Sequence, residues 1–438
     1  MPQYFSDSRP RWRAALATTT LAVTGALVGA PSAAHADVTT VSSANTRTAW
    51  DSTETRLTPT DVKATDFGQL FDRTLSGSIY AQPLVSGSSV LVTTEKANAY
   101  ALDADTGAVK WTKNFGAPFQ SASIWCGDLT PDVGSTSTGV VDPATNTFDF
   151  PTKIADGPDT SHPHWYLHAL DVATGAERTG WPVTIAGTAQ NDPAYTFNAF
   201  GEMQRPGLLL TGGVVYMGFG GHCDIPPYRG WVVGVSTATH AITSMWVSET
   251  GSTDGNGIWM SGSGLVSDGP GRILFATGNG ADPAPSAGSS QPGNVGESVV
   301  RLSVNPDGSL TTADFFTPSN AQTLDVNDAD FGSGGPIALP DSFGSPAHPH
   351  LLAQMGKDGR LFLLDRDHLG GMAQGPNGTD SVVSQSGPFN GLWGHAAAWS
   401  GGGGAGQLYL IDNSGYLRSF SGGVDGSGVP TLAYTGRS

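Results

Sequence analysis

The sequence predicts an all-β fold, a β-propeller of four-stranded antiparallel blades. Short apolar runs alternate with turn residues along the chain, and 60 Gly and 29 Pro occur among 438 residues. The strand–turn–strand pattern of residues 90–111 also recurs downstream in degenerate copies. Repetition at intervals of about 55 to 70 residues is typical of a propeller whose blades carry long loops. A composition of this kind suits many short strands joined by tight turns.

The repeat consists of an apolar run, an alternating run that ends in Ala-Leu-Asp, and a run that ends in Trp. An Asp and a Thr side chain can satisfy the backbone of the turn between the last two runs, and Gly can take the positive φ. The Trp is expected to pack between neighbouring blades. The residues assigned to these structural roles are Asp103, Thr106, Gly107 and Trp111 in the first copy and Asp171, Thr174 and Gly175 in the second.

The repeats divide the chain into an N-terminal arm or partial blade, residues 37–77, and a propeller domain, residues 78–438. Six blades are expected to begin near residues 78, 135, 204, 259, 334 and 394. Because an open sheet edge is a liability, we expect a closing blade after the sixth and a ring of seven or eight blades in total. The propeller is therefore expected to be incomplete at its C-terminus.

Residues 1–36 have the pattern of a secretory signal peptide. Three Arg precede the apolar stretch 14–29, and Ala34-His35-Ala36 is a cleavage site of the A-x-A type. We therefore expect a secreted protein, extracellular or in the cell envelope, with no membrane span. Removing these residues takes three Arg and one Asp from a net charge of −17 and leaves −19. Such a surface argues against nucleic acid as a partner.

Cys126 and Cys223 are the only cysteines of the sequence. In an exported protein a pair of cysteines favours a disulfide over a metal site, and this bond would join neighbouring blades.

The segment Ala101–Trp111 resembles the PQQ-like β-propeller repeat, Ala-x-Asp-x-x-Thr-Gly-x-x-x-Trp, at every fixed position. The chain is thus similar to secreted bacterial PQQ-like repeat proteins of the quinoprotein alcohol dehydrogenase-like superfamily. The resemblance implies two kinds of relative: dehydrogenases that use pyrroloquinoline quinone (PQQ) with Ca²⁺, and an outer-membrane assembly scaffold that does not. The adjacent-cysteine pair of many such dehydrogenases and the haem motif Cys-x-x-Cys-His do not occur in this sequence.

Several polar and aromatic residues near the starts of inner strands are candidates for a substrate or partner funnel: Arg205, His222, Asp224, Trp259 and His395. His222 and Asp224 flank Cys223, so they are either metal or substrate ligands or part of a tight loop tied by the disulfide. Asp325, Asp328 and Asp330 are interpreted as an acidic interblade loop because they lack the EF-hand spacing. Gly278-Asn279-Gly280 is interpreted as a hairpin turn. Catalytic residues and a metal site are not assigned.

The function predicted from these features is that of a monomeric binding or scaffold module, which needs no cofactor. One funnel face would hold a protein, a carbohydrate or a small molecule. The alternative is a PQQ- and Ca²⁺-dependent dehydrogenase that oxidises alcohols or sugars, and a weaker one is a polysaccharide-degrading enzyme. Whether the protein is an enzyme stays open. The sequence lacks the Gly-x-Ser-x-Gly, Walker and His-Glu-x-x-His motifs, which removes the commonest hydrolase and nucleotide-binding interpretations.

Overall fold

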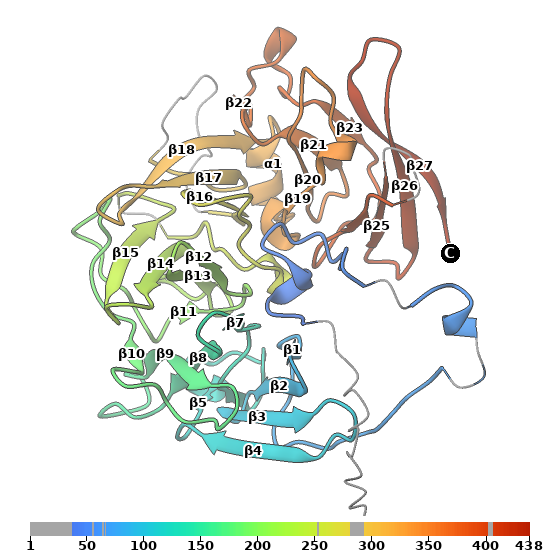
Figure 1. Ribbon diagram of the computed structural model, residues 1–438. Coiled ribbons are helices and arrows are strands. Elements are labelled where there is room, and N and C mark those ends of the chain that lie inside the picture. Colours follow the sequence, from blue (N-terminus) through green and yellow to red (C-terminus); the bar gives the residue numbers. More distant parts are fainter. Residues whose placement is uncertain are drawn as a thin grey trace, which may run out of the picture. The chain divides into compact units, whose positions relative to one another are not determined.

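Six β-sheets follow one another along the chain (Figure 1) in a computed structural model. It describes residues 37–438 except 55–56, 64, 66, 252–253, 281–292 and 402–405, so the expected signal segment 1–36 lies outside the described residues. The described residues belong to one compact unit. Five of the sheets have four strands and the third has five, which confirms the predicted all-β propeller fold.

Each of the first three blades comes from one continuous segment of the chain. Blade 1 contains β1 (Leu84–Ser86), β2 (Ser89–Thr94), β3 (Asn98–Asp103) and β4 (Val109–Asn114). Blade 2 contains β7 (Val140–Asp142), β8 (Thr147–Ile154), β9 (His164–Asp171) and β10 (Val183–Thr184). Blade 3 contains β11 (Glu202–Met203), β12 (Leu209–Thr211), β13 (Val214–Gly221), β14 (Trp231–Ser236) and β15 (Ile242–Val247). A small ribbon of β5 (Phe119–Gln120) and β6 (Asp132–Val133) connects blades 1 and 2.

Blades 4 to 6 come next along the chain, and only the outer strand of blade 4 comes from a later segment. Blade 4 contains β16 (Arg272–Ala276), β17 (Val299–Val304), β18 (Leu310–Thr317) and β22 (Gly371–Met372). Blade 5 contains β19 (Ile337–Ala338), β20 (Leu351–Met355), β21 (Leu361–Asp365) and β23 (Ser384–Ser386). Blade 6 contains β24 (Ala397–Trp399), β25 (Gln407–Ile411), β26 (Leu417–Val424) and β27 (Pro430–Arg437).

Blade 4 departs from the purely antiparallel pattern that the sequence predicts. Its outer strand β22 pairs in parallel with β18, because β22 belongs to the connection that leaves blade 5 after β21. Its inner strand is reduced to a single bridge between Val266 and Leu274.

Helical segments are short and lie in the connections. They are η1 (Val41–Ser43), η2 (Asp61–Lys63), η3 (Ser121–Ile124), η4 (Met260–Gly262), α1 (Ala321–Val326), η5 (Phe331–Ser333), η6 (Asp341–Phe343) and η7 (Pro376–Gly378). Within the described ranges, no helix has the length and apolar character needed to cross a membrane.

The repeat turn has the structure that its sequence predicts. The Asp103 carboxylate accepts hydrogen bonds from the backbone N–H of Thr106 at 3.1 Å and from its hydroxyl at 2.8 Å. Gly107 follows with a φ of +68°. Asp171 and Thr174 form the same bonds in blade 2, at 2.9 and 2.8 Å. The turn therefore satisfies its own polar groups and leaves the flanking strands free to pack.

The segment Val38–Ala49, here called the N-terminal plug, bonds to all six blades. Its partners are, in blade order, Val85, Val141, Leu210, Ser267, Ala338 and Ala398. Arg47 is fully buried and donates to the carbonyl oxygens of Leu208 and Leu265, both at 2.9 Å. Figure 1 shows this segment, in blue, lying among the inner strands. The plug thus takes the place of solvent along the inner edges of the blades.

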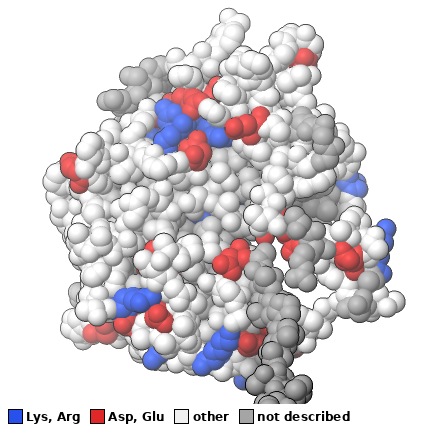
Figure 2. Space-filling model, viewed as in Figure 1, with Lys and Arg blue, Asp and Glu red and all other residues white. Residues whose placement is uncertain are grey.

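Many of the described charged side chains pair with partners of opposite sign. On the face shown in Figure 2, Lys and Arg side chains lie next to Asp and Glu. One such network joins blades 4 and 5, where Arg272 contacts Asp367 at 2.8 Å and Arg366 contacts Asp268 at 2.7 Å.

Candidate ligand-binding funnel

A cavity of about 160 Å³, here called the funnel, lies where loops of several blades meet. Four of these loops are the one after β13, the one after β16, the one before β19 and the one that joins β20 to β21. In an antiparallel blade, these positions share one end of the strands, so residues distant in sequence come together there. The polar and aromatic lining residues are Asp128, Arg205, Asp224, Tyr228, Trp259, Asn279, Asp328, Asp330 and Lys357, with Cys223 beside them.

An ion-paired lysine stands at the centre of this lining. The Lys357 ammonium pairs with the Asp330 carboxylate and lies 3.0 Å from the Asp328 carboxylate. Its Nζ also lies 5.8 Å from the centroid of the Trp259 ring. Burial lowers the pKa of Lys357, but its bonds to Asp330 and Asp328 outweigh this and raise the pKa above the usual 10.5. Lys357 therefore stays charged beside the aromatic ring.

Asp330 is held on two sides and only 4% exposed. Besides the contact with Lys357, its Oδ1 accepts the backbone N–H of Asn279 at 2.9 Å. A Cβ on Gly278 would come within 3.0 Å of Trp259 Nε1, so the β16–β17 connection passes close to the indole edge because Gly278 has no side chain. The carboxylate, the amide residue and the indole are thus fixed relative to one another.

Asp224 adds a second carboxylate to the funnel. Its Oδ1 accepts the Tyr228 hydroxyl at 3.0 Å. Partial desolvation raises the pKa of Asp224, and the charges of Asp330 and Asp328 raise it further. The funnel therefore gathers more negative charge than Lys357 and Arg205 neutralise.

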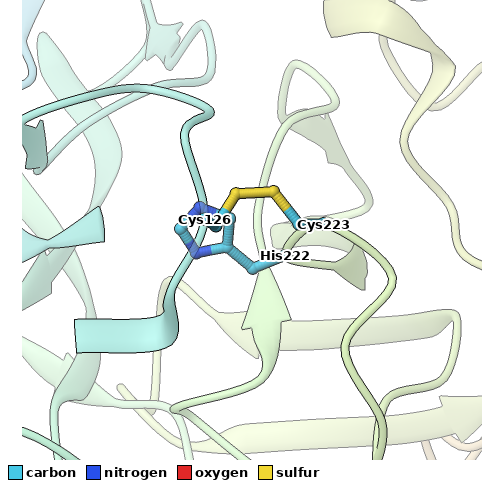
Figure 3. Close-up of side chains that lie close together, drawn as sticks. All are labelled: Cys126, His222 and Cys223. Carbon is cyan, nitrogen blue, oxygen red and sulfur yellow. A yellow bond between two sulfur atoms is a disulfide. The ribbon is translucent and has the colours of Figure 1, made fainter. Parts of the chain in front are cut away.

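Cys126 and Cys223 form a disulfide at the edge of the funnel, with their Cα atoms 6.1 Å apart. The predicted pairing is confirmed. The bond ties the loop after η3 to the β13–β14 connection, and Figure 3 shows the His222 ring beside it. His222 is 2% exposed, and burial, with the charge of Lys153, lowers its pKa to about 4. Among the described residues, these three form the only group of metal-ligand type, and with both sulfurs bonded to each other only His222 is left as a ligand.

Of the residues that the sequence analysis singled out for the funnel, Arg205, Asp224 and Trp259 line this cavity together. His222 adjoins it through Cys223. His395 lines a different cavity of about 510 Å³ beside the plug, where its Nε2 lies 2.7 Å from the Ser42 hydroxyl. The structure thus brings three of the five together in one cavity.

Three central lining residues were not among the predicted funnel residues: Asn279, Asp330 and Lys357. The interpretation of Gly278-Asn279-Gly280 as a hairpin turn is wrong, because the Asn279 backbone bonds to Asp330 and to the Asn256 N–H at 2.7 Å instead of closing a tight hairpin. Lys357 lies in the short Gly-Lys-Asp-Gly loop between two apolar strands. A charged residue between two apolar strands is the signal that could have indicated it.

Sequence comparison finds one family. A profile of the family described as outer membrane protein assembly factor BamB matches residues 5–113 and, in an overlapping match, residues 34–148. No curated protein sequence matches the chain.

Solved structures with this fold include quinoprotein dehydrogenases. Quinohemoprotein alcohol dehydrogenase ADHIIG from Pseudomonas putida HK5 has a TM-score of 0.57 and 15% identity, over 89% of this chain and 58% of that one. The quinohemoprotein alcohol dehydrogenase from Comamonas testosteroni has a TM-score of 0.54 and 17% identity, over 88% of this chain and 59% of that one. A europium-containing methanol dehydrogenase has a TM-score of 0.56 and 15% identity, over 92% of this chain and 72% of that one.

The chain therefore spans about three fifths of the length of the two quinohemoprotein dehydrogenases. At these identities the likeness is one of fold. The blades and the structural neighbours together show a β-propeller fold, and the profile match is confined to residues 5–148.

Proposed function

We propose that the funnel binds PQQ together with a divalent cation, and that the protein is a PQQ- and Ca²⁺-dependent dehydrogenase of alcohols or sugars. The observation that carries this proposal is the meeting of Trp259, the Asp330–Lys357 pair and Asn279 at one cavity. The fold likeness to quinohemoprotein alcohol dehydrogenases supports it without deciding it.

The residues present fit both parts of such a ligand. PQQ is a flat polycarboxylate, and the ring of Trp259 suits a flat ligand. Lys357 and Arg205 are outnumbered by the lining carboxylates, so the divalent cation would have to offset part of the ligand's charge. Ca²⁺ prefers carboxylate and amide oxygens, which Asp330, Asp224 and Asn279 supply. Because the described residues contain no group of three carboxylates within 4.8 Å, the cofactor's own oxygens would have to complete the coordination shell.

The bound quinone would supply the electron-accepting chemistry of the reaction. Asp330 is the group placed to accept a proton from a substrate hydroxyl, because its carboxylate is fixed by Asn279 and Lys357 beside the cavity. Lys357 would orient the flat ligand over Trp259. The disulfide would keep the wall formed by Cys223 in place.

The size of the funnel favours the alternative of a binding module. Small-molecule sites usually measure about 300–1,000 Å³, and the funnel measures about 160 Å³. A non-enzymatic module would hold a smaller polar ligand or a side chain of a partner protein there.

Thermal unfolding with PQQ and CaCl₂, followed by dye reduction with an alcohol and sugar panel, separates the two functions. A dehydrogenase shows a higher Tm at micromolar PQQ and reduces the dye. Asp330→Asn should lower dye reduction by about 100-fold or more and, because Asp330 is also a proposed cation ligand, should reduce the Tm shift. Lys357→Met should lose the shift, whereas Lys113→Met, on exposed strand β4, should keep it. If the wild-type protein shows neither a Tm shift nor dye reduction, it is a binding module.

We also infer that the protein is exported. The disulfide between its only two cysteines supports this, because such bonds persist mainly in oxidising compartments. Fractionation of cells that express the full chain tests it, and retention of the precursor in the cytoplasm contradicts it.

A further inference from the structure

The interface between blades 1 and 2 is tightly filled at the end that carries the repeat turns. Trp111 lies against Gly175 of blade 2, where a Cβ would come within 2.6 Å of the indole. Leu91 and Ala101 are both buried in the same cluster as Trp111. An indole and two apolar side chains thus pack together at this position.

The next interface carries a carboxylate at the corresponding position. Asp149 pairs with Ala169 on the neighbouring strand, as Leu91 pairs with Ala101 in blade 1. The same register position is Tyr216 in blade 3 and Ala353 in blade 5. Among these four blades, Asp149 is therefore the only acidic residue at this register position.

The turn of blade 3 also departs from the repeat. His240 occupies the turn position that Gly107 and Gly175 occupy in blades 1 and 2. Its backbone N–H donates to the carbonyl of Ser236 at 3.0 Å, and the two glycines likewise donate to the carbonyl four residues earlier. The imidazole meets the ring of Trp181 at 5.5 Å between centroids. Trp181 follows its turn glycine by six residues instead of the four that separate Trp111 from Gly107. Hence Trp181 does not close the interface as Trp111 does.

A cavity of about 400 Å³ results, here called the interblade cleft. Its lining includes Thr145, Thr147, Asp149, Arg178, Trp181 and His240. The cleft lies at the β14–β15 turn, whereas the funnel lies at the β13–β14 connection. Because β14 runs between these two connections, the cleft and the funnel open at opposite ends of the blades.

The inner part of the cleft presents polar atoms without partners. Asp149 is 1% exposed, and both of its carboxyl oxygens lack a hydrogen bond from any described residue. The buried Nε of Arg178 also lacks a described partner, although its Nη2 donates to the Thr145 carbonyl at 2.7 Å. Buried polar groups are normally paired, so an acceptor and a donor left open in one cavity indicate a ligand that bonds to both.

The charges around the cleft select the kind of ligand. An anion would meet the carboxylate of Asp142, and a cation would meet the guanidinium of Arg178. A neutral hydroxyl group can donate to Asp149 and accept from Arg178 at once. The threonine hydroxyls add further partners, and the half-exposed Trp181 ring offers a face for the C–H groups of a sugar.

We propose that the interblade cleft is a carbohydrate-binding site that takes a neutral mono- or disaccharide. Its volume lies within the range of about 300–1,000 Å³ that small-molecule sites occupy. The proposal does not depend on the function assigned to the funnel.

Titration calorimetry of the full-length protein with glucose, maltose, cellobiose, trehalose and chitobiose at millimolar concentrations tests the site. At least one of these sugars should bind. Asp149→Leu introduces the residue that blade 1 carries at the same position and should weaken binding about tenfold or more. Thr147→Val keeps the shape of the lining and should also weaken binding. Lys357→Met alters the funnel and should leave the dissociation constant unchanged.

Three results would overturn the proposal. They are no binding of any of these sugars, an affinity equal to that of the wild-type protein in both Asp149→Leu and Thr147→Val, and loss of binding in Lys357→Met. Circular dichroism of each variant shows whether it is folded. If Asp149→Leu does not fold, an affinity in Thr147→Val equal to that of the wild-type protein is sufficient to reject the site.

Discussion

The indole of Trp111 rests on the Cα of Gly175, and its Nε1 donates to the carbonyl of Val172 at 2.9 Å. One side chain of blade 1 thus both packs on and bonds to the turn of blade 2. Phe71 of the arm lies in the same way against Gly107 of blade 1. The contact therefore recurs one step earlier along the chain, with a phenylalanine in place of the tryptophan.

Gly175→Ala should lower the free energy of unfolding by about 2 kcal/mol, because the new Cβ strains a left-handed backbone and displaces the Trp111 ring. Gly87→Ala is the matched control, since Gly87 also has a positive φ but no atom within 4 Å of its Cβ position. Urea unfolding measures both. Equal losses in the two variants would mean that the interblade contact adds nothing to the backbone strain.

Asp149 should make stability depend on pH. Burial, followed by the charge of Asp142, raises its folded-state pKa to about 8 from an ordinary value of 3.8. The native state therefore keeps a proton that the unfolded chain loses, so the stability that this group contributes is greatest below about pH 4 and is lost as the pH rises to about 8.

An asparagine at this position does not titrate, so Asp149→Asn lacks the loss of stability that accompanies the rise in pH. The stability of the variant relative to the wild-type protein should rise between about pH 4 and pH 8, by at most about 1.4 kcal/mol per pH unit, and then level off. Urea unfolding across this range provides the measurement. Asp72→Asn, at an exposed position of the arm, is the control that should show no such rise. A flat difference for Asp149→Asn would contradict the assigned pKa.

Arg47→Met should destabilise the protein by about 3 kcal/mol, because the buried carbonyl oxygens of Leu208 and Leu265 would lose their donor. Arg73 is exposed in the arm, and Arg73→Met should have no measurable effect on urea unfolding. An unchanged midpoint for Arg47→Met would show that the plug contributes little to stability.

Removal of the disulfide should cost about 4 to 5 kcal/mol, since the bond closes a segment with a sequence separation of 97 residues. The double variant Cys126→Ala/Cys223→Ala should unfold at a lower urea concentration than the wild-type protein. A reducing agent should shift the wild-type curve towards that of the variant and leave the variant unaffected. If the agent shifts both curves equally, the effect does not come from this bond.

The blades could be predicted from the sequence because each repeats a local pattern. The Asp103 turn and its copy at Asp171 fix their own hydrogen bonds within a few residues, so short-range chemistry specifies them. The parallel strand β22 could not be predicted, because it pairs with a blade that the chain had already left. Its place depends on the packing of blades 4 and 5.

The funnel could be predicted only in part. Arg205 and Trp259 were singled out because they precede inner strands, and the structure places both in the cavity. Asp330 and Lys357 meet across two loops whose approach depends on the spacing of the blades. His395 has a similar place in its blade, yet it faces the plug at Ser42, a contact 353 positions apart in sequence. No local pattern reports such a contact.

The plug has a consequence for the order in which the molecule can be assembled. Its bonding partners extend from Val85 to Ala398, so the segment that leaves the ribosome early finds its last partner only after blade 6 has been made. Contacts this far apart along a chain form slowly. Thr48, which bonds to Ala398, has to wait unpaired while more than three hundred residues follow.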